Sequence, residues 1–178
     1  MAEDKKEPWL NYLALTTVIL AVCATLSTFK GGGFSTRSVI SQAQASDQWA
    51  FYQAKAIKGD LYQVQSDALA TELAALPPDA SQTRRQVYQA RIADYQKKIA
   101  KYTQDKAAIM KQALVLEHQR DAAARQGRPF GVAVIFLQVA ILISSVAGLF
   151  KRKSVWLAAL PVGLLGLAYF ADGFLLLF

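Results

Sequence analysis

The sequence predicts an all-α fold for an integral membrane protein, with three transmembrane helices and a long extramembrane helical hairpin of the coiled-coil type. The first observation behind this prediction is composition: 53% of the 178 residues are hydrophobic and the mean hydropathy is +0.20, both high for a soluble chain. The second is that the apolar residues collect in three runs. The third is a heptad spacing of apolar residues in the polar segment between the first two runs, which is typical of long packed helices.

The three apolar runs are segments 9–29, 130–150 and 155–178. The first two contain no Asp, Glu, Lys or Arg over 21 residues, and a helix of that length measures about 32 Å, enough to cross a hydrocarbon core of about 30 Å. A signal peptide is the alternative for the first run, but the apolar part of a signal peptide is usually only about 7–15 residues long. We therefore predict three retained transmembrane helices.

A short basic turn, segment 151–154, joins the second and third runs, and three consecutive cations form most of it: Lys151, Arg152 and Lys153. Short loops rich in Lys and Arg usually stay on the cytoplasmic side of a membrane. With three spans, this rule places residues 1–8 in the cytoplasm as a tail and the central segment on the opposite side. Lys5 and Lys6 in the tail agree with this orientation, whereas four cations near the other span ends favour the reverse: Lys30, Arg37, Arg125 and Arg128.

The central segment 30–129 is polar and rich in Ala and Gln, and we predict that it forms two long helical arms with a break at 77–79. Two consecutive prolines stop the first arm, and Asp79 followed three residues later by Gln82 resembles the capping box that opens a helix. The three glycines at 31–33 are expected to end or bend the helix that leaves the first span.

The second arm carries a seam at alternating steps of four and three, which passes through Ala113 and is broken only by Lys106. Its members are Tyr88, Ile92, Tyr95, Ile99, Tyr102, Ile109 and Leu116. A similar stripe in the first arm is expected to pack against this seam; it consists of Ala50, Ala54, Ile57, Leu61, Val64 and Ala68, and near the tip it shifts to Leu69, Leu73 and Leu76. Contact of part of the tyrosine-rich seam with another protomer is the alternative.

Charged residues of the second arm stand at the spacing of helical ion pairs, each of which contributes a few tenths of a kcal/mol. The expected pairs are Asp94 with Lys98, Lys101 with Asp105, and Asp121 with Arg125.

The apolar runs contain small residues at four-residue spacing, which allow close approach of helix backbones. They are Ala140, Ser144 and Gly148 in the second run and Ala159 and Gly163 in the third. Packing of these two spans on each other is the simpler reading, and a contact between protomers is the alternative. Gln138 and Asp172 are the intramembrane polar residues. We expect Gln138 to form an interhelical hydrogen bond, and Asp172 to pair with a cation or to be exposed at the interface. The alternative for both residues is that they line an ion path.

The sequence shows no catalytic, cofactor-binding or metal-binding constellation. Cys23 is the single cysteine and lies in an apolar run, and His118 is the single histidine and falls outside the seam. We therefore expect a protein that is not an enzyme and has no cofactor. The net charge of +7 indicates orientation signals and contact with the lipid bilayer, and no nucleic-acid partner is expected.

The string SDQWAFYQAKAIKGDLY, residues 46–62, resembles the signature of a bacterial membrane family, domain of unknown function 4337, and LQVAILIS within residues 136–148 is similar to the end of that family's pattern. The resemblance implies one span, a long helical segment and a closing pair of spans, in a bacterial inner (cytoplasmic) membrane. It assigns no reaction or ligand. The residues that match the signature form a candidate interaction patch: Trp49, Tyr52, Gln53, Lys55 and Lys58.

These features favour a structural scaffold that assembles as a homo-oligomer through its hairpin and its small-residue transmembrane faces, with the N-terminus cytoplasmic and the hairpin periplasmic. Two alternatives stay open. One is a subunit of a small oligomeric channel or transporter, with Gln138 and Asp172 facing a conduit. The other is an accessory subunit of a larger membrane complex.

Overall fold

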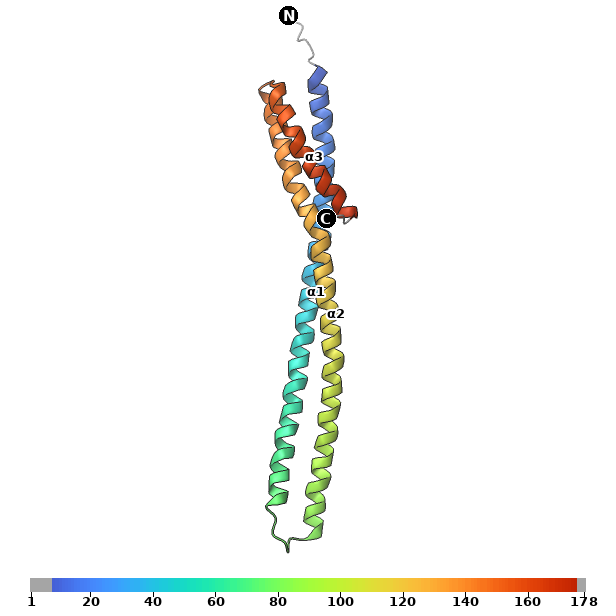
Figure 1. The fold of residues 1–178 in the computed structure, drawn as a ribbon, viewed down its shortest axis with the longest axis vertical. Helices are drawn as coiled ribbons and strands as arrows, with labels where there is room; N and C mark the ends of the chain where they lie inside the picture. The colour runs from blue at the N-terminus through green and yellow to red at the C-terminus, as the bar shows by residue number, and fades with distance from the viewer. Residues whose placement is uncertain (1–7, 176–178) are drawn as a thin grey trace, which may run out of the picture. The chain divides into compact units, whose positions relative to one another are not determined.

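The computed structural model describes residues 8–175 and consists there of three helices: α1 (Pro8–Ala74), α2 (Gln82–Leu149) and α3 (Lys153–Leu175) (Figure 1). No strand occurs within this range. Each helix contains a stretch long and apolar enough to cross a membrane. The all-α prediction is confirmed, while Lys5 and Lys6 of the predicted tail lie outside the described residues.

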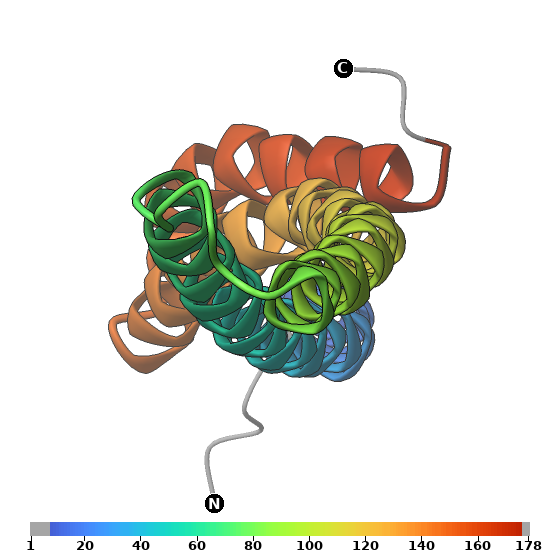
Figure 2. The ribbon, with the colours of Figure 1, turned by 90° about the horizontal axis from the view of Figure 1, so that it is seen from below.

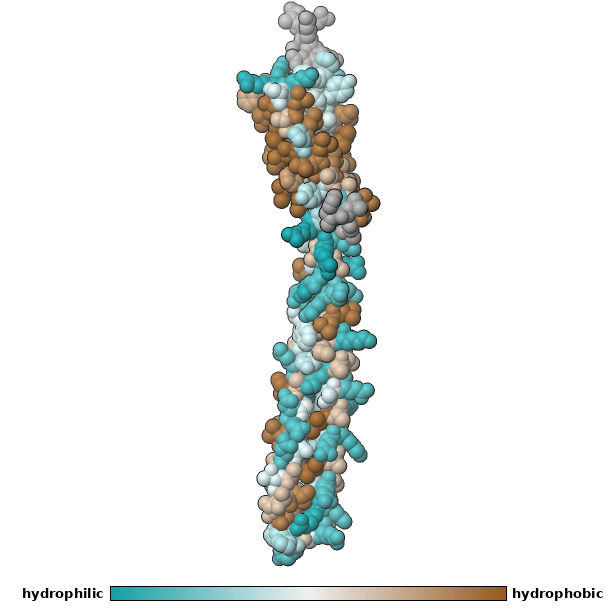
Figure 3. All heavy atoms as spheres, viewed as in Figure 1, coloured by the Kyte–Doolittle hydropathy of each residue, from teal (hydrophilic) through white to brown (hydrophobic). Residues whose placement is uncertain are grey.

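The chain divides into two compact units. The three-helix unit comprises residues 1–40 and 119–178, and the hairpin unit comprises residues 41–118. Figure 3 shows hydrophobic side chains over the surface of the three-helix unit, with Phe29 78% and Leu149 79% exposed. Apolar residues exposed in such number are what a helix bundle presents to lipid, so this unit is compatible with membrane insertion.

The glycines at 31–33 do not end the first helix, because α1 continues through them without interruption. A glycine in a helix interior costs about 1 kcal/mol relative to alanine, a loss that packing can offset. Gly31 provides such packing, since a Cβ at this position would lie 3.2 Å from Phe130 Cβ on α2. The expectation of a helix end or a flexible exit at these glycines is therefore wrong.

The connection between α1 and α2 covers residues 75–81 and contains both prolines; Figure 2 views it end-on. Ser81 is the cap of α2, because the Arg84 backbone N–H donates to the Ser81 carbonyl at 3.0 Å and approaches its Oγ at 3.4 Å. The capping box expected at Asp79 is two residues too early. The Arg85 guanidinium also donates to the Pro77 carbonyl at 2.7 Å, which ties the turn to the start of α2.

The core of the three-helix unit is built from small and medium-sized residues. One cluster joins α1 and α2 and contains Leu20, Ala24, Ala133, Leu137 and Ala140. The buried face of α3 contains Trp156, Ala159, Gly163, Gly166, Asp172 and Gly173. Because so many of these residues lack a large side chain, the helix backbones can come close together.

Candidate functional site

The hairpin unit holds most of the predicted site residues, and its inner face is formed by the second-arm seam. All seven predicted members of that seam are half-buried or buried, with Ile109 only 6% exposed. Lys106, which interrupts the seam, lies with its Nζ 5.8 Å from the centroid of the Tyr52 ring. A cation over an aromatic face is attracted by the ring, so the Tyr52 ring helps the seam to accommodate this lysine.

The first arm turns a different face inward than expected. Ile57, Leu61 and Val64 of the predicted stripe are 68%, 55% and 66% exposed, and the three alanines of that stripe are exposed as well. The residues that face the second arm instead keep the same four–three spacing in another phase: Ala45, Gln48, Tyr52, Lys55, Gly59, Tyr62, Ser66, Leu69 and Leu73. The expectation is wrong from Ala50 to Ala68, because two stripes of heptad spacing exist and the aromatic one packs inside, whereas Leu69 and Leu73, expected near the turn, do face inward.

Trp49 and Tyr52 of the candidate patch are thus part of the hairpin interior. The Trp49 indole N–H donates to Glu117 Oε1 at 2.9 Å. Its ring also meets the Tyr52 ring edge-on, with centroids 5.6 Å apart. The hydrogen bond joins the two arms and has a charged acceptor, which makes it one of the stronger kinds, while the aromatic pair lies within α1.

Lys55 lies inside the seam as well and pairs across the hairpin. Its Nζ donates to Asp105 Oδ2 at 2.8 Å and lies 5.4 Å from the centroid of the Tyr102 ring. The Lys55 hydrogen bond lowers the pKa of Asp105 below its usual range, desolvation opposes this shift, and the charges of Lys55 and Lys101 add to it. Asp105 thus bonds to Lys55 on the other arm, whereas the sequence suggested Lys101.

A second aromatic group lies further along the same seam. Tyr62 stacks on Tyr102 at 5.9 Å and contacts Tyr95 at 5.4 Å. The Nζ of Lys98 is 5.1 Å from the Tyr62 ring centroid and 2.9 Å from Asp94 Oδ2, which confirms the predicted ion pair, and the hydrogen bond to Asp94 raises the pKa of Lys98. Lysines and tyrosines therefore alternate along the interior of the hairpin.

Two further polar contacts lie one in each unit. A hydrogen bond with the Glu72 carboxylate raises the pKa of Tyr88 and links the two arms near the turn. In the three-helix unit, Asp121 Oδ1 accepts a hydrogen bond from Arg120 Nε at 2.8 Å, a neighbour that spacing rules for helical pairs do not consider.

Gln53 and Lys58 are exposed on the outside of the first arm. The five residues that match the family signature therefore do not form one surface patch. Three of them hold the hairpin together, and the other two flank the exposed stripe of the same helix.

The two intramembrane polar residues lie in different environments. Gln138 is exposed on α2, whereas Asp172 is only 3% exposed, so the expectation that Asp172 is exposed at the interface is wrong. Its side chain is engaged by neighbouring groups. Nearby on α3, the Phe174 ring lies 5.9 Å from Lys30 Nζ, which places this cation of α1 beside the end of α3.

The small residues predicted for helix packing lie at helix contacts within the unit. Ala140, Ser144, Ala159 and Gly163 are buried and Gly148 is half-buried. A Cβ on Gly163 would lie 3.2 Å from Leu20 Cδ2, and one on Gly148 would lie 3.7 Å from Leu13 Cδ2. These contacts join the spans within one chain.

Gly166 and Gly173 make the tightest contacts, and they were missed in the sequence. A Cβ on Gly166 would lie 2.8 Å from Leu137 Cγ, and one on Gly173 would lie 2.7 Å from Phe130 Cζ. The sequence signal that could have found Gly166 is the continuation of the four–three spacing from Ala159 through Gly163, whereas this run of small residues stops before Gly173.

The basic turn has a defined backbone. The Arg152 N–H donates to the Ala147 carbonyl at 3.0 Å and the Lys151 N–H to the Gly148 carbonyl at 3.4 Å, the two hydrogen bonds of a Schellman C-cap. Lys151 occupies the left-handed position of that cap with a φ of 50°, and all three cations of the turn are exposed.

Residues 8–175, which the structure describes, contain no group of three or more His, Cys, Asp or Glu side chains that could hold a metal ion. Cys23 is a free, half-buried thiol of α1. The sites that the structure does assemble are packing sites, in which aromatic, basic and acidic side chains join helices.

Fold and packing together define a class: an α-helical protein with three helices able to cross a membrane and a helical hairpin with a polar, aromatic seam. The family model of domain of unknown function DUF4337 matches residues 9–176, so the chain belongs to this family and the resemblance seen in the sequence is confirmed. Neither a curated protein nor a solved structure matches the chain.

Proposed function

We propose that this chain is a non-enzymatic integral membrane scaffold whose hairpins associate with those of further copies of the same chain. The observation that carries this proposal is the stripe on the outer face of α1, here called the outer stripe: Ala50, Ala54, Ile57, Leu61, Val64 and Ala68. Ile57 and Val64 are about two-thirds exposed, at 68% and 66%. Heptad spacing of apolar residues is the pattern with which one helix packs into another.

A second copy fits this stripe in a parallel arrangement. Chains inserted in one membrane with the same orientation present α1 in the same direction, which favours parallel pairing of equivalent stripes. In a parallel pair, the residue just before Ala54, Leu61 or Ala68 of the outer stripe faces the residue five positions further on in the other copy. Gln53 then faces Lys58 and Asp60 faces Gln65, so no like charges meet between Ala50 and Val64.

The pairing is expected to end after Val64. One heptad further, Asp67 of one copy would face Glu72 of the other, and two carboxylates opposite each other are destabilising. The self-associating part of the hairpin is therefore the stretch from Ala50 to Val64, about four turns of helix.

Cysteine cross-linking in membranes tests the proposal. Leu61→Cys in a Cys23→Ser background should form a disulfide-linked dimer on mild oxidation, because a parallel two-fold pair places equivalent inner positions close together. Gln104→Cys, exposed on the other arm, is the matched control and should stay monomeric. Absence of the Leu61→Cys dimer at native density, or a strictly monomeric mass in mild detergent, would contradict self-association.

The channel alternative receives less support from the same structure. A conduit between protomers requires both intramembrane polar residues to face outward, yet Gln138 is exposed and Asp172 is 3% exposed. Flux into proteoliposomes that disappears with Asp172→Asn would favour a channel. Co-purification of other proteins from native membranes separates a self-assembled scaffold from an accessory subunit of a larger complex.

The proposal includes an orientation in a bacterial inner membrane, with the N-terminus in the cytoplasm and the hairpin in the periplasm. It rests on the basic turn between α2 and α3, since short cationic loops stay cytoplasmic. Labelling of intact cells with a membrane-impermeant thiol reagent tests it: Gln104→Cys in the hairpin should react, and Ser154→Cys beside the turn should react only after lysis. The reverse pattern would invert the topology.

A further inference from the structure

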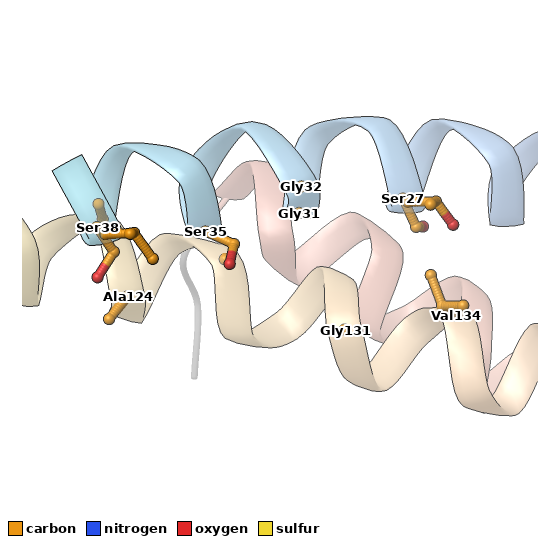
Figure 4. Close-up of a pocket in the computed structure, with 12 residues that line it drawn as sticks. Ser27, Gly31, Gly32, Ser35, Ser38, Ala124, Gly131 and Val134 are labelled. Atoms are coloured by element: carbon orange, nitrogen blue, oxygen red, sulfur yellow. The ribbon is translucent and has the colours of Figure 1, made fainter.

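A groove runs between α1 and α2 in the three-helix unit, with a volume of about 560 Å³ (Figure 4). Its walls are made of small residues, and Figure 4 shows Ser35 and Ser38 projecting from α1 on the side of Ala124 and Gly131. Gly131 leaves the groove open, because a Cβ there would have nothing within 4 Å. The groove is wide enough for a chain-like or small polar group.

A second hollow of about 540 Å³ adjoins the groove and shares Thr28 and Gly32 with it. Lys30 and Arg37 line this hollow. A Cβ on Gly32 would also have nothing within 4 Å, so the surface is open where the two hollows meet.

The charged residues that line these hollows, Lys30 and Arg37, are cations. Four cations stand where the apolar runs meet the polar segment: Lys30, Arg37, Arg125 and Arg128. No Asp or Glu lines either hollow; Asp121 and Asp172, the acids of the described part of the three-helix unit, lie outside the two linings. Lys30 and Arg37 are seven residues apart on one helix, about 10 Å along its axis, so both can reach one phosphate-sized anion.

The groove is also amphiphilic along its length. It starts at Ser27 and Val134, inside the apolar runs, and ends near Arg37, beyond them. The Ser27 hydroxyl is fully buried and has no hydrogen-bond partner within the described residues, so the fold leaves one polar group at the apolar end unsatisfied. A free inorganic anion matches only the basic end of such a groove.

We infer that this groove binds an anionic phospholipid. The phosphate lies between Lys30 and Arg37, and the glycerol and ester groups lie over Thr28 and Gly32, with the exposed Ser35 hydroxyl as a donor to an ester oxygen. The inference depends on insertion into a membrane and not on the proposed self-association. It also gives a reason for cations at the end of the spans opposite the basic turn, where topology alone disfavours them.

Native mass spectrometry of the full chain in mild detergent, with equimolar phosphatidylglycerol and phosphatidylcholine, tests this inference. The wild type should retain phosphatidylglycerol preferentially. The double variant Lys30→Gln/Arg37→Gln should bind it about twentyfold more weakly, because each cation near an anionic lipid contributes about a factor of five. The matched control Arg84→Gln/Lys97→Gln removes two exposed cations of the hairpin and should bind as the wild type does.

A substitution that changes the shape of the groove but not its charge tests whether the groove itself, and not only the cations, binds the lipid. Gly32→Leu fills the open junction without a clash at its Cβ and should reduce phosphatidylglycerol retention, whereas Thr36→Leu, exposed on the same helix, should not. Helix content by circular dichroism verifies that each variant is folded. Equal retention of both lipids by the wild type, equal loss in the control pair, or displacement of the lipid by millimolar inorganic phosphate would overturn the inference.

Discussion

In the three-helix unit, α3 meets its neighbours through glycines, whereas the hairpin unit fills its interior with tyrosines, a tryptophan and ion pairs. Gly166 and Gly173 stand so close to α2 that a Cβ would overlap with it. In the hairpin, Gly59 is the contrasting case, because its Cβ would lie at an ordinary 3.5 Å from Tyr102 Cβ. Close backbone approach at glycines joins helices of the first unit, where aromatic pairs such as Phe130 with Phe174 at 5.2 Å contribute as well, and large side chains join the helices of the second.

The difference follows from what surrounds each unit. In lipid, apolar side chains gain little by turning inward, so helices associate where small residues allow extensive contact. In water, a two-helix hairpin must bury area, and aromatic residues bury the most per residue while their polar atoms find partners across the seam. The same chain therefore packs its helices in two ways. Larger side chains at the helix contacts should destabilise the three-helix unit, and smaller ones should destabilise the hairpin unit.

The largest expected effect comes from adding a methyl group to a tight glycine contact. Gly166→Ala places a Cβ 2.8 Å from Leu137 Cγ and 2.9 Å from the Leu137 backbone N. Because the backbone cannot rotate away, α3 has to shift, and we expect a loss of about 1–3 kcal/mol in the free energy of unfolding. Thermal and denaturant unfolding in detergent measures this loss.

Gly131→Ala is the matched control, since a Cβ there has nothing within 4 Å. This variant should lose no stability and gain up to about 1 kcal/mol, because alanine is the better helix former. Equal effects of the two substitutions would mean that proximity of the backbones does not hold this unit together.

The next effect compares the indole hydrogen bonds of the two units. Trp49→Phe removes the bond to the Glu117 carboxylate at 2.9 Å, and Trp156→Phe removes the bond to Thr16 Oγ1 at 3.2 Å. A charged acceptor makes the first bond stronger, so we expect a loss of about 1.5 kcal/mol for Trp49→Phe and about 0.6 kcal/mol for Trp156→Phe. Hydrogen–deuterium exchange of peptides from each unit assigns each loss to its unit. A larger loss for Trp156→Phe would reverse the ranking.

A smaller effect is expected from pH in the hairpin unit. The pKa of Asp105 is lowered in the folded chain by Lys55, so its contribution to stability is present above the ordinary pKa of Asp and is lost as pH falls through the folded value. Acidification below about pH 4 should therefore loosen the hairpin. Asp105→Asn should be less stable at neutral pH and less sensitive to acid.

Trp49 fluorescence is the local probe for this measurement, in a background of Trp9→Phe and Trp156→Phe. Asp47→Asn, an exposed carboxylate of the same unit, is the control and should titrate like the parent. An acid transition of Asp105→Asn identical to that of the parent would remove the cross-hairpin pair from the account of stability.

Sequence reasoning predicted the membrane-capable helices and the second-arm seam because both depend on local periodicity. It failed in the first arm because two stripes there have the same spacing. The choice between them depends on the partner: Tyr62 lies inside because it can contact Tyr95 and Tyr102 across the seam. This information belongs to pairs of residues about 30 or more apart in the chain, which periodicity within one helix does not contain.

The same limit explains the site residues. Local spacing joined Asp105 with Lys101, yet Lys55, fifty residues away, makes the hydrogen bond. A signature match grouped Trp49 with Lys58, although Trp49 is half-buried and bonds to Glu117 on the other arm and Lys58 is exposed. Close glycines such as Gly173 were invisible because their role depends on Phe130, which a single sequence does not place opposite them.

The smallest expected effect concerns the turns that close the two units. The hairpin turn uses two prolines and the Ser81 cap, whereas the turn between α2 and α3 places Lys151 in a left-handed conformation at a φ of 50°. Glycine is the usual residue at that position, because a Cβ there is costly. Lys151→Gly should therefore raise the free energy of unfolding by about 0.5 kcal/mol, the relief of strain being partly offset by chain entropy. Lys151→Asn removes the same charge and tolerates the same conformation, so it should gain less; a loss of stability in both variants would show that the charge of this turn matters more than its backbone.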